Sequence, residues 1–172
     1  MKKLAITLLF AIFALISCAN VQTTSYFSSA KVKLSDYSAL EIQEFESAAE
    51  NFPEEALTII PNLVAEKLRA KNLKFDKVSY GEIDSVSPEE TLVLLGEITK
   101  YVGGGEVNYE SGNVKFGEVD INVDIVILQK YNGRDIASGE VSSLNTASFL
   151  GGTDKMYQQI ADEIVKYILQ NY

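Results

Sequence analysis

The chain of 172 residues contains no histidine, no tryptophan and a single cysteine. Without an imidazole it has no Ser/His or Cys/His nucleophile pair and no histidine-ligated zinc or haem. One thiol cannot form an intramolecular disulfide or a thiolate metal cage. These absences exclude many classes of enzyme and metalloprotein, and the length predicts one domain of ordinary size.

The amino terminus has the layout of an export signal. Lys2 and Lys3 precede residues 4–16, in which only Thr7 is not apolar, and small residues surround the cysteine that follows. A helix that spans a bilayer needs about 20 apolar residues, so this shorter run indicates a signal peptide and not an anchor. We therefore predict that residues 1–17 are a signal peptide that is removed.

The end of this segment, Leu15-Ile16-Ser17-Cys18, resembles the lipobox of bacterial lipoprotein precursors. In those proteins lipid is attached to the cysteine thiol, and cleavage makes that cysteine the first mature residue. The resemblance implies lipid attachment at Cys18, with two or three acyl chains, palmitate among them, holding the domain firmly on a membrane. Ala19 stands where an aspartate would favour the inner membrane, so the resemblance implies the outer membrane, facing the periplasm. The alternative is an ordinary signal peptide with a chance cysteine near its end.

The charge balance bears on possible partners. Removal of residues 1–17 would take two of the 15 basic residues and none of the 24 acidic ones, leaving 13 against 24 and a net charge of −11. Such a surface repels phosphate backbones and anionic lipid head groups. We therefore expect no nucleic-acid binding, and membrane attachment through covalent lipid.

Hydrophobic patterning predicts an α+β fold. Residues 18–33, polar and poor in apolar side chains, are expected to form a lipidated flexible tether, and residues 34–172 a single domain. The predicted order is β-α-β-β-β-β-α: strands at 37–45, 75–80, 92–101 and 119–128, another strand after the Asn-Gly pair at 132–133, and helices at 53–72 and from Thr153, the expected N-cap, onward. We expect a mostly antiparallel sheet with both helices packed on one face.

The Asn-Gly pair at 132–133 predicts a hairpin whose register depends on the length of its loop. A two-residue loop would set Ile127 opposite a serine. A three-residue loop over 131–133, closed by Lys130 and Arg134, sets Ile127 opposite Ala137 and keeps the buried face apolar. We therefore predict the three-residue loop.

Several segments carry a family resemblance: residues 95–101, LGEITKY, with glycines after them, then Phe116-Gly117, the alternating strand at 119–128, the glycine hairpin and the terminal amphipathic helix. They resemble a family of uncharacterised bacterial envelope lipoproteins, a domain of unknown function, although Gln129 and Asn132 replace the acid and threonine usual in that family. Its layout is similar to the periplasmic domain of the curli secretion-channel lipoprotein and the amino-terminal domain of the Tol-system translocation protein. The resemblance implies an envelope role through protein contact and supplies no catalytic residues.

One row of polar side chains could bind a hard cation. Asp120, Asn122 and Asp124 alternate along one predicted strand, and the predicted register adds Glu140 opposite Asp124. Calcium prefers such oxygen ligands, but a strand spaces residues of one face about 7 Å apart, too far for one ion. We expect a solvated sheet face there, slightly destabilised by the opposed acids, and no metal site.

The sequence therefore predicts a membrane-anchored envelope lipoprotein that is a non-catalytic protein-binding or assembly module, with no cofactor and no catalytic residue. Tyr101, Tyr109 and Tyr131 fall near predicted loops and are candidates for one contact surface or for half-buried sheet positions. The alternatives are a small-molecule or lipid carrier, and a carboxylate-based, metal-dependent enzyme. Either alternative requires a pocket of about 300 Å³ or more with converging polar groups.

Overall fold

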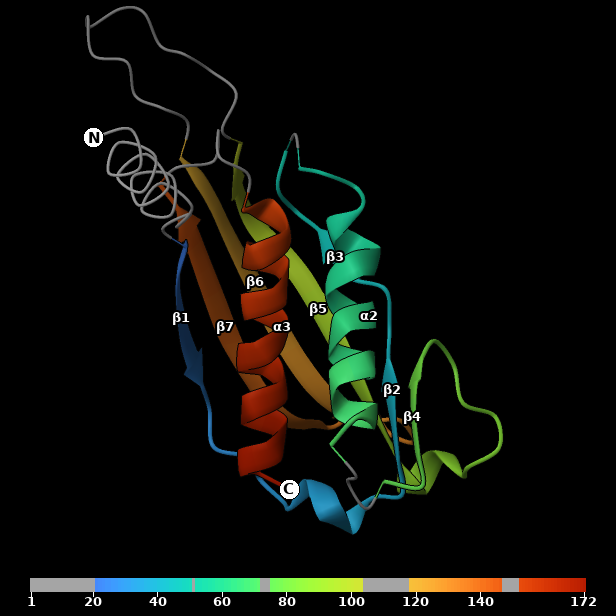
Figure 1. The fold of residues 1–172 in the computed structure, drawn as a ribbon. Helices are drawn as coiled ribbons and strands as arrows, with labels where there is room; N and C mark the ends of the chain where they lie inside the picture. Colours follow the sequence, from blue (N-terminus) through green and yellow to red (C-terminus); the bar gives the residue numbers. More distant parts are fainter. Residues whose placement is uncertain (1–20, 51, 72–74, 104–117, 147–151) are drawn as a thin grey trace, which may run out of the picture.

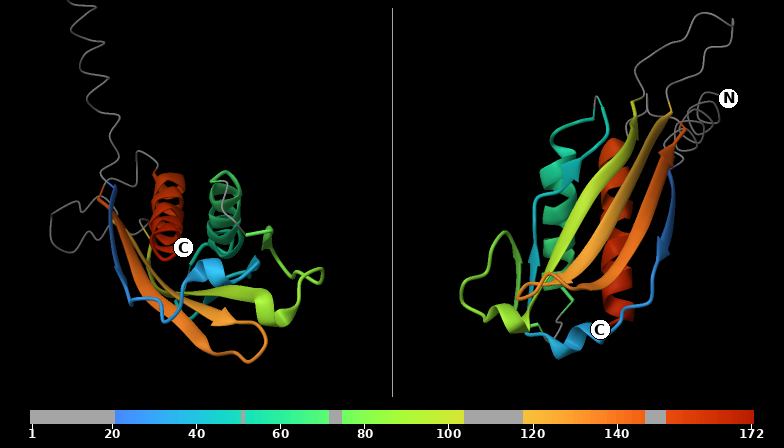
Figure 2. Two further views of the ribbon diagram at one scale, coloured as in Figure 1. Left: turned by 90° about the horizontal axis from the view of Figure 1, so that it is seen from below. Right: turned by 180° about the vertical axis from the view of Figure 1, so that it is seen from behind.

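The computed structural model describes residues 21–50, 52–71, 75–103, 118–146 and 152–172. Within them one curved sheet carries two helices on one face (Figures 1 and 2). The strands are β1 (Val21–Phe27), β2 (Ala39–Ile42), β3 (Glu46–Ser47), β4 (Lys77–Tyr80), β5 (Thr91–Val102), β6 (Val119–Gln129) and β7 (Asp135–Asn145). The helices are α2 (Ala56–Arg69) and α3 (Thr153–Gln170), with short 3₁₀ turns η1 (Leu34–Asp36) and η2 (Pro88–Glu90).

The predicted α+β class, with two helices on one face, is confirmed, and the sheet is mixed. The strand order is β1-β7-β6-β5-β2-β4, with β3 paired to β5 beside this path. Strands β5, β6, β7 and β1 pair antiparallel, whereas β2 runs parallel to both β4 and β5. The parallel pair β2–β4 follows from the α2 crossover, because a helix between two neighbouring strands returns the chain to the same end of the sheet.

The prediction of a flexible tether at 18–33 is wrong from Val21 onward. Strand β1 pairs with β7 from Val21 opposite Asn145 to Phe27 opposite Gly139. The chain stays attached after the strand ends, since the N–H of Lys31 donates to the carbonyl of Ile136 at 3.0 Å. Residues 18–20 lie outside the described part of the chain.

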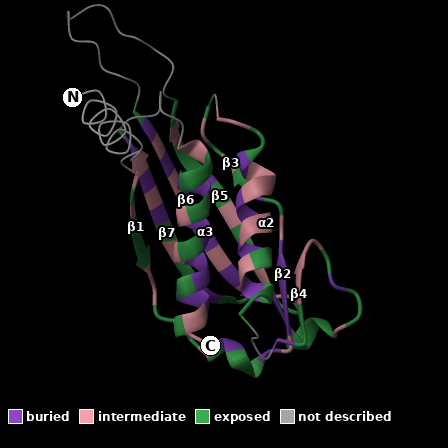
Figure 3. Ribbon diagram, in the orientation of Figure 1, coloured by how far each residue is buried: buried purple, intermediate pink, exposed green. Residues whose placement is uncertain are grey.

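The core lies between the sheet and the two helices (Figure 3). Strand β6 alternates as predicted, with its odd-numbered apolar residues buried and its even-numbered residues on the open face. Helix α2 is continuous through Pro61 and ends at Arg69, within the predicted range 53–72. Helix α3 begins at Thr153, but its N-cap is Gly152, with φ 117°, and not Thr153 itself. A left-handed backbone there suits glycine, which has no Cβ.

The hairpin between β6 and β7 has the predicted register over most of its length, with Ile127 opposite Ala137. Its closing pair is different, because a register shift after Ile127 makes Gln129 the partner of Arg134, whose carbonyl accepts the Gln129 N–H at 3.0 Å. The loop is therefore residues 130–133, and the predicted Lys130–Arg134 closure is wrong. Lys130 instead joins the neighbouring strand, where its N–H donates to the carbonyl of Thr91 at 2.9 Å.

Among the described residues, no helix has the length and apolar character needed to cross a membrane.

Candidate functional site

The predicted row of polar side chains lies on the open face of the sheet. Asp120 forms an ion pair with Lys100 on β5, and the Asn122 amide donates to Glu140 at 3.1 Å. Asp124 lies opposite Glu140, as predicted. Burial and, second, the negative charge of Glu140 raise the pKa of Asp124 above its usual range. In the described ranges no three acidic or thiol side chains gather as metal ligands would, so the row is a network across strands.

A second charged cluster, which sequence reasoning missed, lies at the other edge of this face. Glu41 of β2 is buried, forms an ion pair with Lys130, and accepts the N–H of Ile83 at 2.8 Å. The hydrogen bond to Glu41 raises the pKa of Lys130, although burial opposes it. The pair fixes the loop before β7 and the segment after β4 against β2, so we assign it a structural role. The sequence feature that could have indicated this ion pair is Glu41 itself, a single acid within a short apolar strand.

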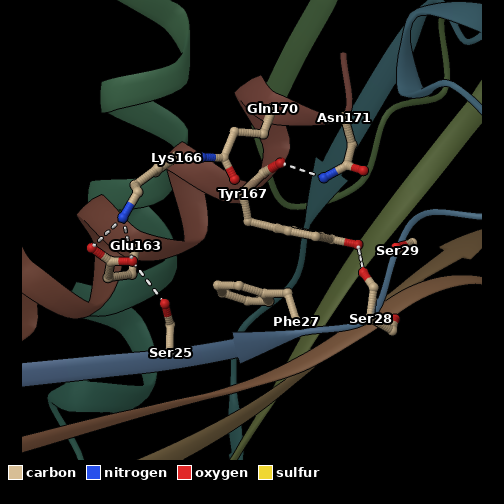
Figure 4. Close-up of a pocket in the computed structure, with 9 residues that line it drawn as sticks. All are labelled: Ser25, Phe27, Ser28, Ser29, Glu163, Lys166, Tyr167, Gln170 and Asn171. Atoms are coloured by element: carbon tan, nitrogen blue, oxygen red, sulfur yellow. Dashed lines mark hydrogen bonds and ion pairs between the residues drawn. The ribbon is translucent and has the colours of Figure 1, made fainter.

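An open groove of about 430 Å³ lies between β1 and α3 (Figure 4). Its lining comes from the end of β1 with the two serines that follow, and from the last turns of α3: Ser25, Phe27, Ser28, Ser29, Glu163, Lys166, Tyr167, Gln170 and Asn171. We call it the β1–α3 groove. Its volume exceeds the lower bound expected for ligand pockets.

The charged groups of the β1–α3 groove are bonded to one another. Ser25 Oγ donates to Glu163 at 2.7 Å, and Lys166 Nζ lies 3.1 Å from the same carboxylate. The groove is closed on one side by the rings of Phe27 and Tyr167, which stack with centroids 4.3 Å apart. Burial raises the pKa of Tyr167, whose hydroxyl donates to the Ser28 carbonyl at 2.8 Å. The arrangement can therefore present hydrogen-bonding groups to a polar occupant.

Strand β1 is the terminal strand of the sheet, next to this groove. Ser28 N–H donates to the Ser138 carbonyl, and bonded and non-bonded pairs alternate along an antiparallel ladder. The backbone groups of Thr23 and Ser25 therefore point away from β7, toward the outer edge. Natural proteins usually protect such an edge with lysine, proline or a bulge. Residues 19–30 contain no charged residue and no proline, so this edge has neither kind of protective residue in the part of the chain that the structure describes.

The opposite edge of the sheet is shorter and carries a charge. Strand β4 has four residues, and its exposed Lys77 reaches Ser85 at 3.0 Å. The two edges therefore differ, and β1 with the β1–α3 groove is the stronger candidate for a contact site.

Of the two alternatives for the tyrosines, the single contact surface does not apply to Tyr101 and Tyr131, and Tyr101 is a partly buried sheet residue. Tyr101 pairs with Ile121 at the end of β5, whereas Tyr131 follows β6 at the opposite end of the sheet. Tyr131 is exposed, and the length of β6 separates it from Tyr101. Tyr109 and Cys18 lie outside the described residues, and lipid attachment at Cys18 stays a prediction.

Comparison with solved structures shows what fold this is. The chain is similar to PelC from Paraburkholderia phytofirmans, crystallised as a dodecamer, with a TM-score of 0.60 and 17% identity over 88% of this chain and 99% of that one. A variant PelC dodecamer gives a TM-score of 0.61 and 14% identity over 86% and 97% of the two chains. A DUF330 protein from Xanthomonas campestris gives 0.51 and 12% over 84% and 91%. The chain has the fold of these proteins.

No protein-family model matches the chain, and no curated protein matches it in sequence. The likeness to the curli and Tol proteins stays a prediction.

Proposed function

We propose that this protein is a bacterial envelope lipoprotein, held by lipid on Cys18 at the outer membrane and facing the periplasm. In this proposal it is a non-catalytic assembly module that binds copies of itself through β1. The observation that carries the proposal is the unprotected, uncharged edge of β1 beside the β1–α3 groove. The fold adds support, since PelC, with the same fold, crystallised as a dodecamer.

An added strand fits this surface better than a small ligand does. Seven residues of strand extend about 23 Å, and a second strand could pair with the outward backbone groups over this length. Side chains of the added strand could enter the β1–α3 groove, where serines, Gln170 and Asn171 offer hydrogen bonds. The groove's charged pair, Glu163 and Lys166, is already bonded internally and leaves little charge for a small ion.

The test uses two substitutions at one position. Ser25→Pro removes an outward N–H that β7 does not use, and proline is tolerated on edge strands. Ser25→Ala removes only the side chain and its bond to Glu163. The lipidated full-length chain, extracted in mild detergent, is examined by native mass spectrometry across a range of concentrations. We expect wild type and Ser25→Ala to form oligomers and Ser25→Pro to dissociate at least about tenfold more readily.

Wild-type protein that stays monomeric at every concentration would contradict the proposal. So would Ser25→Pro oligomers as stable as those of wild type. Hydrogen exchange in β1 and β7 checks that Ser25→Pro retains its fold.

The second candidate function, a carrier of a small polar molecule, is favoured by the 430 Å³ volume of the β1–α3 groove. It predicts a bound molecule that co-purifies with the monomer, is seen by native mass spectrometry, and is lost in Gln170→Trp, which fills the groove. Ser25→Pro separates the two candidates, because a carrier would keep its bound molecule in this variant, whereas an assembly module would lose its oligomers.

A further inference from the structure

The position of β1 places the lipid attachment site beside one end of the sheet. This follows from the proposed lipid on Cys18 and from the finding that ordered strand begins at Val21. Three residues, fully extended, span at most about 11 Å. A flexible tether of sixteen residues would reach about 50 Å. Because β1 begins at Val21, the domain must lie much closer to the lipid than such a tether would allow.

Four strand ends meet at that end of the sheet. Val21 pairs with Asn145, Val119 pairs with the same asparagine, and Val102 pairs with Asp120. Strands β1 and β6 therefore start, and strands β5 and β7 finish, at the same end of the sheet. Helix α3 also starts at this end, and the carboxyl terminus lies at the opposite end (Figure 1). We call this the β1-start end.

We propose that the β1-start end lies against the lipid surface, with the sheet and both helices extending away from the bilayer. Val102, which has 48% of its surface exposed, is a large apolar side chain at this end and contacts the head-group region. Because the chain has a net negative charge, anionic head groups would repel it, and we propose that the lipid surface it contacts is zwitterionic.

Tyr131 marks the opposite end. It is 64% exposed and lies two residues beyond Gln129, the last residue of β6. The eleven residues of β6 span about 35 Å, so Tyr131 lies well beyond the head groups if the β1-start end contacts them. The hairpin loop and the η1 and η2 turns, which lie with it, face the periplasm.

The absence of tryptophan makes the test direct, because one introduced tryptophan is the only one in the chain. Val102→Trp and Tyr131→Trp are made separately in the full-length lipidated protein. Each is placed in phosphatidylcholine vesicles with or without lipids that carry a spin label, which quenches fluorescence at short range, on the head group. We expect the tryptophan at 102 to lose most of its fluorescence and the one at 131 to lose little.

A third protein tests whether the short connection causes the result. Twelve Gly and Ser residues inserted between Asn20 and Val21 add about 19 Å of average reach. The insertion is expected to restore most of the fluorescence of the tryptophan at 102. Thr146→Trp, at an exposed position directly after β7, serves as a second probe of the β1-start end if Val102→Trp disturbs the fold.

Vesicle flotation separates this inference from the proposed lipid anchor. Protein that does not float with vesicles contradicts lipid attachment. Protein that floats, but whose tryptophans at 102 and 131 are quenched equally or not at all, contradicts the orientation alone.

Discussion

Two tyrosines on α3 differ in one hydrogen bond. The hydroxyl of Tyr157 is buried and has no hydrogen-bond partner among the described residues, whereas that of Tyr167 donates to the Ser28 carbonyl at 2.8 Å. A buried polar group without a partner costs about 1–3 kcal/mol, and a hydrogen bond contributes about 1 kcal/mol. The same substitution should therefore have opposite effects at the two positions.

We expect Tyr157→Phe to raise the free energy of unfolding by about 1 kcal/mol at pH 7, and Tyr167→Phe to lower it by about 1 kcal/mol. Urea unfolding, followed by circular dichroism, measures both. Burial, with smaller contributions from nearby charges, raises the pKa of Tyr157 well above its usual range. Stability from this raised pKa is complete below about pH 10 and is lost as the pH rises further, so the advantage of Tyr157→Phe should grow there. Equal destabilisation by both substitutions would contradict the assignment.

Strand β1 packs on the sheet at a position where β7 has no side chain. A Cβ added to Gly139 would lie 2.7 Å from the Tyr26 carbonyl oxygen and would also overlap the ring of Phe27. That ring stacks on Tyr167, so Gly139 allows β1, β7 and α3 to meet. The docking of the strand therefore depends on one glycine.

We predict that Gly139→Ala lowers the free energy of unfolding by about 1–3 kcal/mol, because the methyl group forces β1 away from β7. Ser142→Ala, on the exposed side of the same strand, should change it by less than about 0.5 kcal/mol. Urea unfolding gives both values, and hydrogen exchange should show faster exchange in β1 of Gly139→Ala than in wild type. Unchanged exchange in β1 would mean that the strand does not depend on this contact.

Strand β1 shows which parts of the fold can be predicted from the sequence and which cannot. Periodicity in β6 and in α3 follows from burial of one face, and both elements were predicted correctly with most of the hairpin register. Strand β1 reads as VQTTSYF, too polar to suggest a strand, because an edge strand buries little of its surface. Its stability comes from Gly139 and Tyr167, more than 100 residues away in the chain, and no local pattern reveals such partners. The β1–α3 groove was missed for the same reason.

The parallel pair β2–β4 was missed although the predicted strand–helix–strand order contains the crossover that makes neighbouring strands parallel. That order could not reveal that β2 also lies beside β5, with which it runs parallel. Glu41 is a second case, since its partner Lys130 comes from a loop distant in sequence. The charge in that short strand was visible, but its ion pair was not.

The two proposals together restrict how copies can assemble on one membrane. Antiparallel pairing between two β1 strands would turn the β1-start end of one copy away from the lipid. Pairing of β1 with β4 of the next copy keeps both β1-start ends on the same side, because β1 and β4 run in opposite directions within the sheet. Such head-to-tail contacts close into rings when the rotation between copies allows it.

Assembly of this protein should also depend on salt in a characteristic direction. The chain carries a net charge of −9, and the proposed mature form −11, while the contact strand carries none. Copies therefore repel one another as whole molecules, although β1 is uncharged and β4 adds only Lys77 to the contact. Salt screens that repulsion beyond a Debye length of about 8–10 Å at physiological strength. We expect the dissociation constant of the oligomer to fall at least about tenfold between 20 mM and 500 mM sodium chloride. Sedimentation equilibrium in detergent measures it. A contact held by opposite charges would weaken over the same range, so a rise in the dissociation constant would contradict assembly through β1.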